Sequence, residues 1–189
     1  MRLVLASDSP RRRELLIAAG FAVDVVMPVI DESIHGRERP DELVERLARS
    51  KAQSIAHTHV DDVIVAGDTV VVIDHEILGK PRDRADAARM LRQLSGRSHS
   101  VFSGIAVIAN AAISSGVEHT TVTIDALADD DIAWYVATDE PLGKAGAYAI
   151  QGLGSRFVAR IDGSYTNVVG LPIPLLIRLL REAGCRILQ

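Results

Sequence analysis

The chain has 189 residues, of which 48% are hydrophobic and 24% charged, and its formal net charge is −4. This length and composition are typical of a globular protein with a buried core, and we assign residues 1–189 to a single domain. The negative charge and the aromatic content of only 4% argue against binding to nucleic acid, which needs a basic face or stacking side chains.

Two further features of the composition concern the compartment. The single cysteine, Cys185, excludes an internal disulfide and fits a reducing compartment, so we expect a cytoplasmic protein. The apolar run at the N-terminus is too short for a signal peptide, and the longest uncharged stretch is broken by polar residues. We therefore expect no membrane association.

The first segments predict a strand, a turn and a helix. Leu3–Ala6 has the pattern of a buried strand, and Ser9 is a suitable N-cap for the helix that follows. Three arginines at positions 11–13 occupy the first helical turn, where the helix dipole disfavours cations until an anion arrives. Because free N–H groups, hydroxyls and guanidinium groups all bind phosphate, we favour a phosphate site here. A solvated basic patch paired with Asp8 and Glu14 is the alternative.

A weak strand over 22–27 and a loop over 28–39 lead to a strongly amphipathic helix over 40–57. The loop carries Asp31 and Glu32, which are candidate metal ligands, although acidic loop residues are more often solvated. Lys51 lies on the helix and, taken alone, is expected at the surface.

The central stretch is VIVAGDTVVVIDHEILGKP, residues 63–81. Its two apolar runs flank Gly67 and Asp68 and predict one long buried strand that folds back as a hairpin. An ionised carboxylate in such a strand is costly unless a cation, a metal or hydrogen-bond donors compensate it. Gly67 lets another group come close, and Lys80 follows in the hairpin. The pattern indicates an active-site acid with a basic partner, whereas a turn between two shorter strands is the alternative.

The rest of the chain alternates helices and strands. We expect helices over 83–94, 129–137 and 172–184, strands over 98–109, 117–127 and 157–161, a turn over 110–116 and a loop over 167–171. A glycine-rich stretch, residues 139–154, carries Lys144, Tyr148 and Gln151 as its candidate functional side chains. Neither a Walker A loop nor a dinucleotide-binding fingerprint is present.

Five segments, in this order and spacing, resemble the Maf family of nucleoside triphosphate pyrophosphatases. They are LASDSPRRRELL (5–16), VAGDTVV (65–71), LGKP (78–81), LSGRSHSV (94–101) and DEPLGKAGAYAIQG (139–152). The resemblance implies a mixed α/β, two-lobed fold of the inosine triphosphatase-like type, with a long central mixed sheet flanked by helices and a cleft between the lobes. It also implies hydrolysis of a nucleoside triphosphate to the monophosphate and diphosphate with a divalent cation, Mg²⁺ or Mn²⁺. The KAGAYAIQG form is similar to the branch that prefers dTTP and UTP.

The resemblance also implies roles for individual residues. Asp68 matches the family's catalytic proton acceptor and, with Glu32, its metal ligands. Three residues match positions associated with substrate specificity, namely Arg11, Thr69 and Gln151. Four match phosphate-binding positions, namely Ser7, Arg12, Lys51 and Lys80. Asp8 departs from the pattern, since a small residue is common there, and it adds negative charge beside the expected phosphate site.

Two other classes of function remain open. The family has been associated with arrest of septum formation, so the chain is alternatively a nucleotide-sensing interaction protein that affects cell division. A phosphoesterase acting on sugar phosphates or dinucleotides is a third reading. We expect a nucleoside triphosphate, or a modified pyrimidine nucleotide, as the partner in house-cleaning of the nucleotide pool. The oligomeric state is left open, with a homodimer among the options.

Overall fold

The computed structural model describes residues 2–185. Its strands and helices, in chain order, are β1 (Leu3–Ala6), α1 (Pro10–Ala18), β2 (Val23–Val26), α2 (Pro40–Ala56), β3 (Val63–Ile73), β4 (Glu76–Leu78), α3 (Arg84–Leu94), β5 (Ser98–Ala109), β6 (Ala112–Ile124), α4 (Asp129–Ala137), the 3₁₀ turns η1 (Ala145–Ala147) and η2 (Leu153–Phe157), β7 (Val158–Asp162), α5 (Tyr165–Val169) and α6 (Ile173–Glu182). Within this part of the chain the strands form a 7-stranded sheet in the order β2-β1-β3-β5-β6-β7, with β4 paired to β3. The predicted mixed α/β fold is confirmed.

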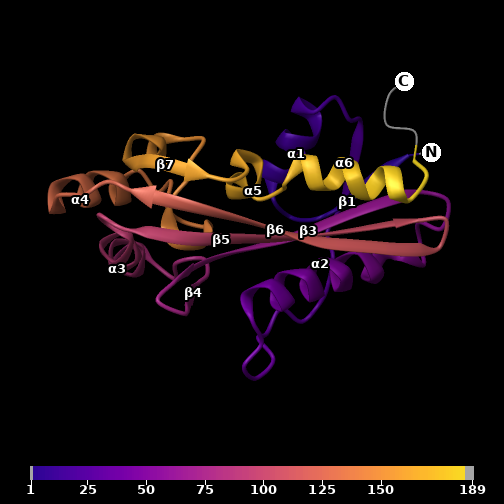
Figure 1. The fold of residues 1–189 in the computed structure, drawn as a ribbon, viewed down its shortest axis with the longest axis horizontal. Helices are drawn as coiled ribbons and strands as arrows, with labels where there is room; N and C mark the ends of the chain where they lie inside the picture. The colour runs from indigo at the N-terminus through magenta and orange to yellow at the C-terminus, as the bar shows by residue number, and fades with distance from the viewer. Residues whose placement is uncertain (1, 186–189) are drawn as a thin grey trace. The chain divides into compact units, whose positions relative to one another are not determined.

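The strand order reverses at β1. This strand pairs in parallel with both β2 and β3, so that Leu3 lies opposite Val23 on one side and Val63 on the other. The chain reaches β2 through α1 and returns to β3 through α2. Since such crossovers are right-handed, the two helices fall on opposite faces of the sheet. Figure 1 shows α2 on one face of these strands and α1 and α6 on the other.

Strand alternation divides the apolar side chains into two cores, because successive residues of a strand point to opposite faces. The core on the α1 and α6 face includes Leu5, Leu16, Val63, Val65, Ile105, Val107, Leu171, Leu175 and Leu176. The core on the α2 face includes Val4, Ala6, Ala48, Ala52, Ile55, Ile64, Ala66 and Ala106. In the part of β3 that belongs to the first unit, up to Thr69, the odd-numbered residues therefore face α1 and α6, and the even-numbered ones face α2.

The chain divides into two compact units. The described part of the first unit consists of residues 2–69, 103–118 and 170–185, and the second unit consists of Val70–Phe102 and His119–Val169. Strands β3, β5 and β6 contribute residues to both units. The assignment of a single domain and the cleft between lobes stay predictions.

Two boundaries differ from the sequence prediction. β6 begins at Ala112 instead of residue 117, because the turn before it needs only Asn110 and Ala111, which adopt φ values of 51° and 61°. The polar run expected as a turn is in the strand, where Gly116 makes room for α6: a Cβ on it would lie 3.2 Å from Leu175 Cδ1. The segment expected as a loop over 167–171 contains the end of α5.

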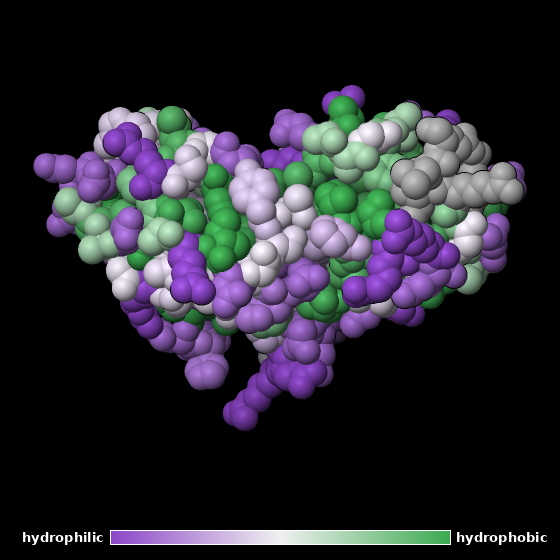
Figure 2. All heavy atoms as spheres, turned by 45° about the horizontal axis from the view of Figure 1, so that its top comes forward, coloured by the Kyte–Doolittle hydropathy of each residue, from purple (hydrophilic) through white to green (hydrophobic). Residues whose placement is uncertain are grey.

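The surface is mixed in character. On the face shown in Figure 2, apolar residues are interrupted by polar ones. None of the helices within residues 2–185 combines the length and the hydropathy that a membrane span needs.

Candidate active site

The candidate site begins where β1 ends. Ala6 is the last residue of β1 and lies opposite Ala66, so the next residues of β3, Gly67, Asp68 and Thr69, extend past their parallel neighbour. In open α/β sheets, ligands bind outside the carboxyl ends of the strands at the point where the strand order reverses. The Gly-Asp-Thr motif occupies this position within one continuous strand, so the alternative of two shorter strands is wrong.

Asp68 is an even-numbered residue of β3 and faces α2, where Lys51 meets it. Lys51 Nζ donates to Asp68 Oδ1 over 2.7 Å and contacts Glu32 Oε1 over 2.7 Å. The side chains of Lys51 and Asp68 are 6% and 13% exposed, whereas that of Glu32 is 58% exposed. A buried ammonium is costly unless it is paired, and the two carboxylates provide the pairing. The sequence-only expectation of a surface lysine is therefore wrong.

Thr69 is an odd-numbered residue of β3 and faces α1, where Arg12 lies buried at 8% exposure. The guanidinium of Arg12 donates from Nε to the Gly170 carbonyl over 2.8 Å, from Nη1 to Ser7 Oγ over 3.1 Å and from Nη2 to Thr69 Oγ1 over 3.3 Å. Thr69 Oγ1 also shares a hydrogen bond of 2.8 Å with Ser103 Oγ. Ser7, Arg12 and Thr69 thus form one polar cluster, in which Ser7 and Arg12 are buried and Thr69 is half-buried.

The charge of Arg12 is only partly compensated by the protein, since its pKa is lowered on balance. Burial lowers the pKa of Arg12, while the nearby Asp68 carboxylate raises it. Three protein acceptors hold the side chain in place without any anion, and the expectation that this arginine is unfavourable until a phosphate arrives stays a prediction. Its Nη1 and Nη2 groups each carry a second N–H, which leaves donors for a ligand.

The other arginines of this turn differ from Arg12. Arg11 is half-buried, and burial lowers its pKa, whereas Glu14 and Asp8 raise it. Arg13 is exposed, which is what the alternative of a solvated basic patch predicts. Ser9 makes no side-chain cap; instead its N–H donates to Ser7 Oγ over 3.1 Å.

Two glycines let the polar clusters form. A Cβ on Gly67 would lie 3.2 Å from the Gly104 carbonyl oxygen and 3.5 Å from Arg12 Nε. A Cβ on Gly104 would lie 2.3 Å from the Val44 carbonyl oxygen, so the backbone of α2 packs directly on β5. The expectation that Gly67 allows a close approach is confirmed. Gly104 was not identified from the sequence, since no local pattern indicates which helix crosses it.

The remaining predicted site residues belong to the second unit. Lys80 and Gln151 are both exposed there, and their grouping with Asp68 stays a prediction. Tyr148 is not a surface functional group, because it is 6% exposed and its hydroxyl lies 2.8 Å from His99 Nε2. Lys144 donates to the Glu140 carbonyl.

The carboxylates of Asp68 and Glu32 are the groups that fit a divalent cation. No three His, Cys, Asp or Glu side chains gather as a metal site within residues 2–185. Mg²⁺ is commonly bound through one or two carboxylates, with waters and substrate phosphates completing its shell. Asp68 and Glu32 converge on the same Lys51 ammonium, so the donor set matches such a site.

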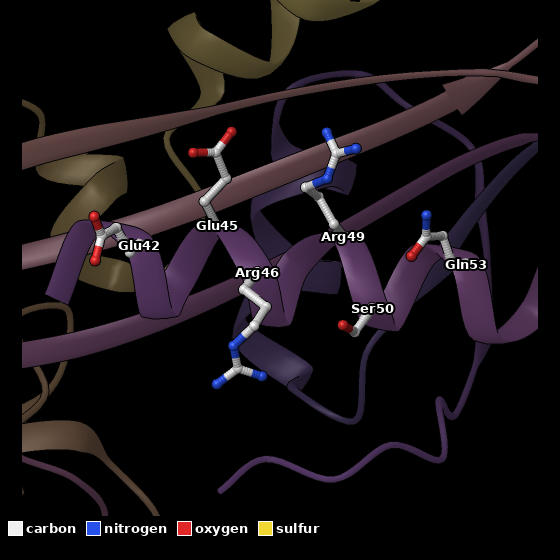
Figure 3. Close-up of a pocket in the computed structure, with 6 residues that line it drawn as sticks. All are labelled: Glu42, Glu45, Arg46, Arg49, Ser50 and Gln53. Carbon is white, nitrogen blue, oxygen red and sulfur yellow. The ribbon is translucent and has the colours of Figure 1, made fainter. Parts of the chain in front are cut away.

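A polar groove on α2 is lined by other residues. Figure 3 shows Glu45 and Arg49 pointing to one side of the helix and Arg46 and Ser50 to the other. The groove is lined by Glu42, Glu45, Arg46, Arg49, Ser50 and Gln53. Ser115 links two of them, since Arg49 Nη1 donates to its Oγ over 2.9 Å and its Oγ donates to Glu45 Oε1 over 2.6 Å. The groove contains none of the predicted site residues, and we assign it to the solvated face of α2.

Comparisons with known proteins cover almost the whole chain. The family model described as Maf-like protein matches residues 2–183. A protein of Anaeromyxobacter dehalogenans named dTTP/UTP pyrophosphatase is 51% identical over 188 residues, which cover 97% of this chain and 94% of that protein. A protein of Acinetobacter baylyi with the same name is 50% identical over 178 residues, covering 94% and 97%.

The structure of the Staphylococcus aureus Ham1 protein covers 84% of this chain and 80% of its own, with a TM-score of 0.51 and 14% sequence identity. At that identity the likeness concerns the fold alone, and it agrees with the fold that the sequence predicts. The family match and the similarity of full-length relatives lead to a single assignment: the chain belongs to the Maf family.

Proposed function

We propose that this chain is a nucleoside triphosphate diphosphatase that hydrolyses dTTP and UTP to the monophosphate and diphosphate. The observation that carries the proposal is the Asp68 carboxylate, paired with a buried Lys51 at the carboxyl end of parallel strands in a Maf chain. Relatives that are 45–51% identical over most of the chain are named dTTP/UTP pyrophosphatase, which supports this choice of substrates. The substrates are nucleotides of the cytoplasm, modified pyrimidine nucleotides among them.

The proposed reaction is attack of water on the α-phosphorus. The new P–O bond forms as the bond to the bridging oxygen breaks, and diphosphate leaves. Asp68 accepts the proton of the attacking water, which is general-base catalysis. Because Lys51 contacts Oδ1, it fixes the carboxylate and keeps Oδ2 for the water. Lys51 and Arg12 place positive charge next to this carboxylate, as an anionic substrate requires.

We propose that Asp68 and Glu32 hold one divalent cation, Mg²⁺ or Mn²⁺. When bound, the cation supplies positive charge that neutralises the phosphate oxygens. Glu32 is the more exposed of the two carboxylates and lies on a loop, so it can turn from Lys51 toward a cation.

Selectivity for the base is assigned to Gln151. A uracil or thymine edge presents a carbonyl acceptor and an N3–H donor, and a carboxamide can meet both. A buried polar group left unpaired by the wrong base costs about 1–3 kcal/mol. We therefore expect at least ~10-fold preference in kcat/KM for dTTP and UTP over CTP and purine triphosphates, largely lost in Gln151→Ala.

The test is a panel of nucleoside triphosphates with Mg²⁺ or Mn²⁺, with diphosphate and orthophosphate detected separately. The unmodified protein should release diphosphate, and Asp68→Asn should lose at least ~100-fold in turnover while keeping its fold. Asp61→Asn, which changes an exposed carboxylate before the same strand, is the matched control. Tight binding of nucleotides without diphosphate release would contradict the proposal, as would near-normal turnover in Asp68→Asn.

A further inference from the structure

The segment that carries Gln151 is a tight turn in the second unit. The N–H of Gly152 donates to the Ala149 carbonyl over 3.1 Å, which closes a four-residue turn. Within it Ile150 is buried at 6% exposure, while Gln151 is exposed. The backbone of this turn therefore decides where the carboxamide of Gln151 is presented.

The turn is held on both sides by Tyr135 of α4 and by Glu140, which lies three residues after the end of that helix. Before it, Ala149 N–H donates to the Tyr135 hydroxyl over 3.0 Å. After it, Leu153 N–H donates to Glu140 Oε1 over 2.9 Å and Gly154 N–H donates to Glu140 Oε2 over 3.0 Å. The Tyr135 hydroxyl in turn donates to Glu140 Oε2 over 2.7 Å. A carboxylate and a phenol thus form one connected network around the turn.

The glycines next to Gln151 are explained by this network. A Cβ on Gly152 would lie 2.1 Å from Glu140 Oε1, and a Cβ on Gly154 would lie 2.6 Å from the Tyr135 hydroxyl oxygen. Both distances are shorter than any real contact of a Cβ, so the backbone can approach the two side chains only where these residues are glycine. These two glycines therefore make room for Glu140 and Tyr135.

The two anchoring side chains are themselves fixed. Tyr135 is fully buried, and its ring meets the ring of Phe157 edge-on with centroids 5.2 Å apart. Burial alone would raise the pKa of Glu140, but hydrogen bonds from Tyr135, Leu153 and Gly154 outweigh it and lower the pKa. Glu140 is therefore an ionised acceptor at neutral pH, which makes its hydrogen bonds stronger than those of a neutral group.

We propose that Glu140, acting with Tyr135, is a positioning residue that fixes the turn carrying Gln151 and so sets the selectivity of the enzyme for the base. The inference rests on the proposed function, because it concerns how that reaction selects its substrate. A carboxamide can rotate to suit a cytosine edge as well as a uracil edge, so its position against the base matters, and the backbone beneath Gln151 sets that position. In this role Glu140 itself touches neither the base nor the phosphates.

The test uses Glu140→Gln, which keeps the size of the side chain but replaces an ionised acceptor with a group that is half donor. We expect the ratio of kcat/KM for dTTP to that for CTP to fall about 3- to 10-fold, with kcat for dTTP changed less than the ratio. Tyr135→Phe should lower the ratio similarly. In a protein that already carries Gln151→Ala, neither change should lower this ratio further, because both act through Gln151.

The matched control is Asp139→Asn, the same chemical change one residue earlier. Asp139 has φ 60°, which asparagine tolerates, and its carboxylate pairs with exposed Arg84 over 2.7 Å. Asp139→Asn should leave the ratio of kcat/KM for dTTP to that for CTP unchanged. Amide hydrogen exchange without nucleotide gives a readout independent of catalysis: exchange at Ala149, Leu153 and Gly154 should quicken in Glu140→Gln but not in the control.

The outcomes separate the two proposals. A selective unmodified enzyme whose ratio is unchanged in Glu140→Gln would overturn the positioning role and leave the proposed function intact. Equal losses of kcat for every nucleotide would also overturn it, since they indicate a merely structural role. If the unmodified protein releases no diphosphate, the proposed function is overturned, and the ratio of Kd values for dTTP and CTP decides the positioning role. Absence of any such binding preference would then overturn the inference as well.

Discussion

Arg12→Ala should destabilise the protein in the absence of any nucleotide. The change removes a buried guanidinium that donates hydrogen bonds to the Gly170 carbonyl, Ser7 Oγ and Thr69 Oγ1. Hydrogen bonds to a charged group contribute about 1.5–3 kcal/mol each, but the desolvation of the arginine offsets part of that sum. Leaving these three acceptors unpaired costs about 1–3 kcal/mol each, and after that offset we expect a net loss of about 3 kcal/mol.

For a chain of this size, a loss of 1 kcal/mol lowers Tm by about 2–4 °C, so Arg12→Ala should melt about 6–12 °C below the unmodified protein. Thermal and urea unfolding, followed without ligand, measure this directly. Arg13→Ala is the matched control, because Arg13 belongs to the same helical turn and is exposed. It should stay within about 0.5 kcal/mol of the unmodified protein.

Arg12→Lys separates charge from geometry. Lysine keeps the positive charge but cannot reproduce the planar set of donors that reaches three acceptors, so it should recover only part of the lost stability. A ligand-free Arg12→Ala protein that melts within about 2 °C of the unmodified one would refute the structural role of Arg12. The guanidinium would then be held only once an anion is bound.

Two further predictions concern stability. Burial lowers the pKa of His99 to about 4, below the ~6.5 of an unfolded histidine. The unfolded chain therefore binds more protons between these pH values, and the free energy of unfolding should fall by up to ~3 kcal/mol as the pH drops from ~6.5 to ~4. His99→Gln should lack this component in urea titrations, and identical pH profiles for both proteins would contradict it. Gly104→Ala should lower the free energy of unfolding by at least ~2 kcal/mol and reduce activity, because the new Cβ would collide with the Val44 carbonyl. Gly79→Ala should do neither, since no atom lies within 4 Å of a Cβ at that position. Equal urea midpoints for the two variants would contradict this prediction, because they would show that α2 can move away.

The sequence predicted most of the helices and strands, because these depend on local patterns of apolar and polar residues. Alternating and continuous apolar runs gave β1, β3 and β5 their bounds, and the hairpin to β4 follows from the chain reversal at Asp74 and His75. β6 was placed less well, since its serines and Gly116 have turn-like composition. Only the packing of Leu175 on Gly116 shows that this stretch is covered and extended.

The burial of Lys51 could have been found in the sequence. Val44, Leu47, Ala48, Ala52 and Ile55 form the apolar stripe of α2, and residue 51 falls on the same stripe by its spacing. A lysine at a core position requires an anionic partner. The sequence cannot say which carboxylate supplies it, because Asp68 and Glu32 reach Lys51 from separate segments.

By itself, the sequence determined the family, the strand that carries Asp68 and the candidate residues, since each of these is a matter of local order and spacing. Only the tertiary structure decided which of these residues are fixed by hydrogen bonds to distant parts of the protein. Arg12 is bonded to the Gly170 carbonyl, 158 residues away, and the turn of Gln151 is fixed by Glu140 and Tyr135. The physical reason is that a hydrogen bond depends on distances in space, and backbone carbonyls and N–H groups are the same in every residue. No pattern of side chains marks the few that a buried guanidinium or carboxylate will meet.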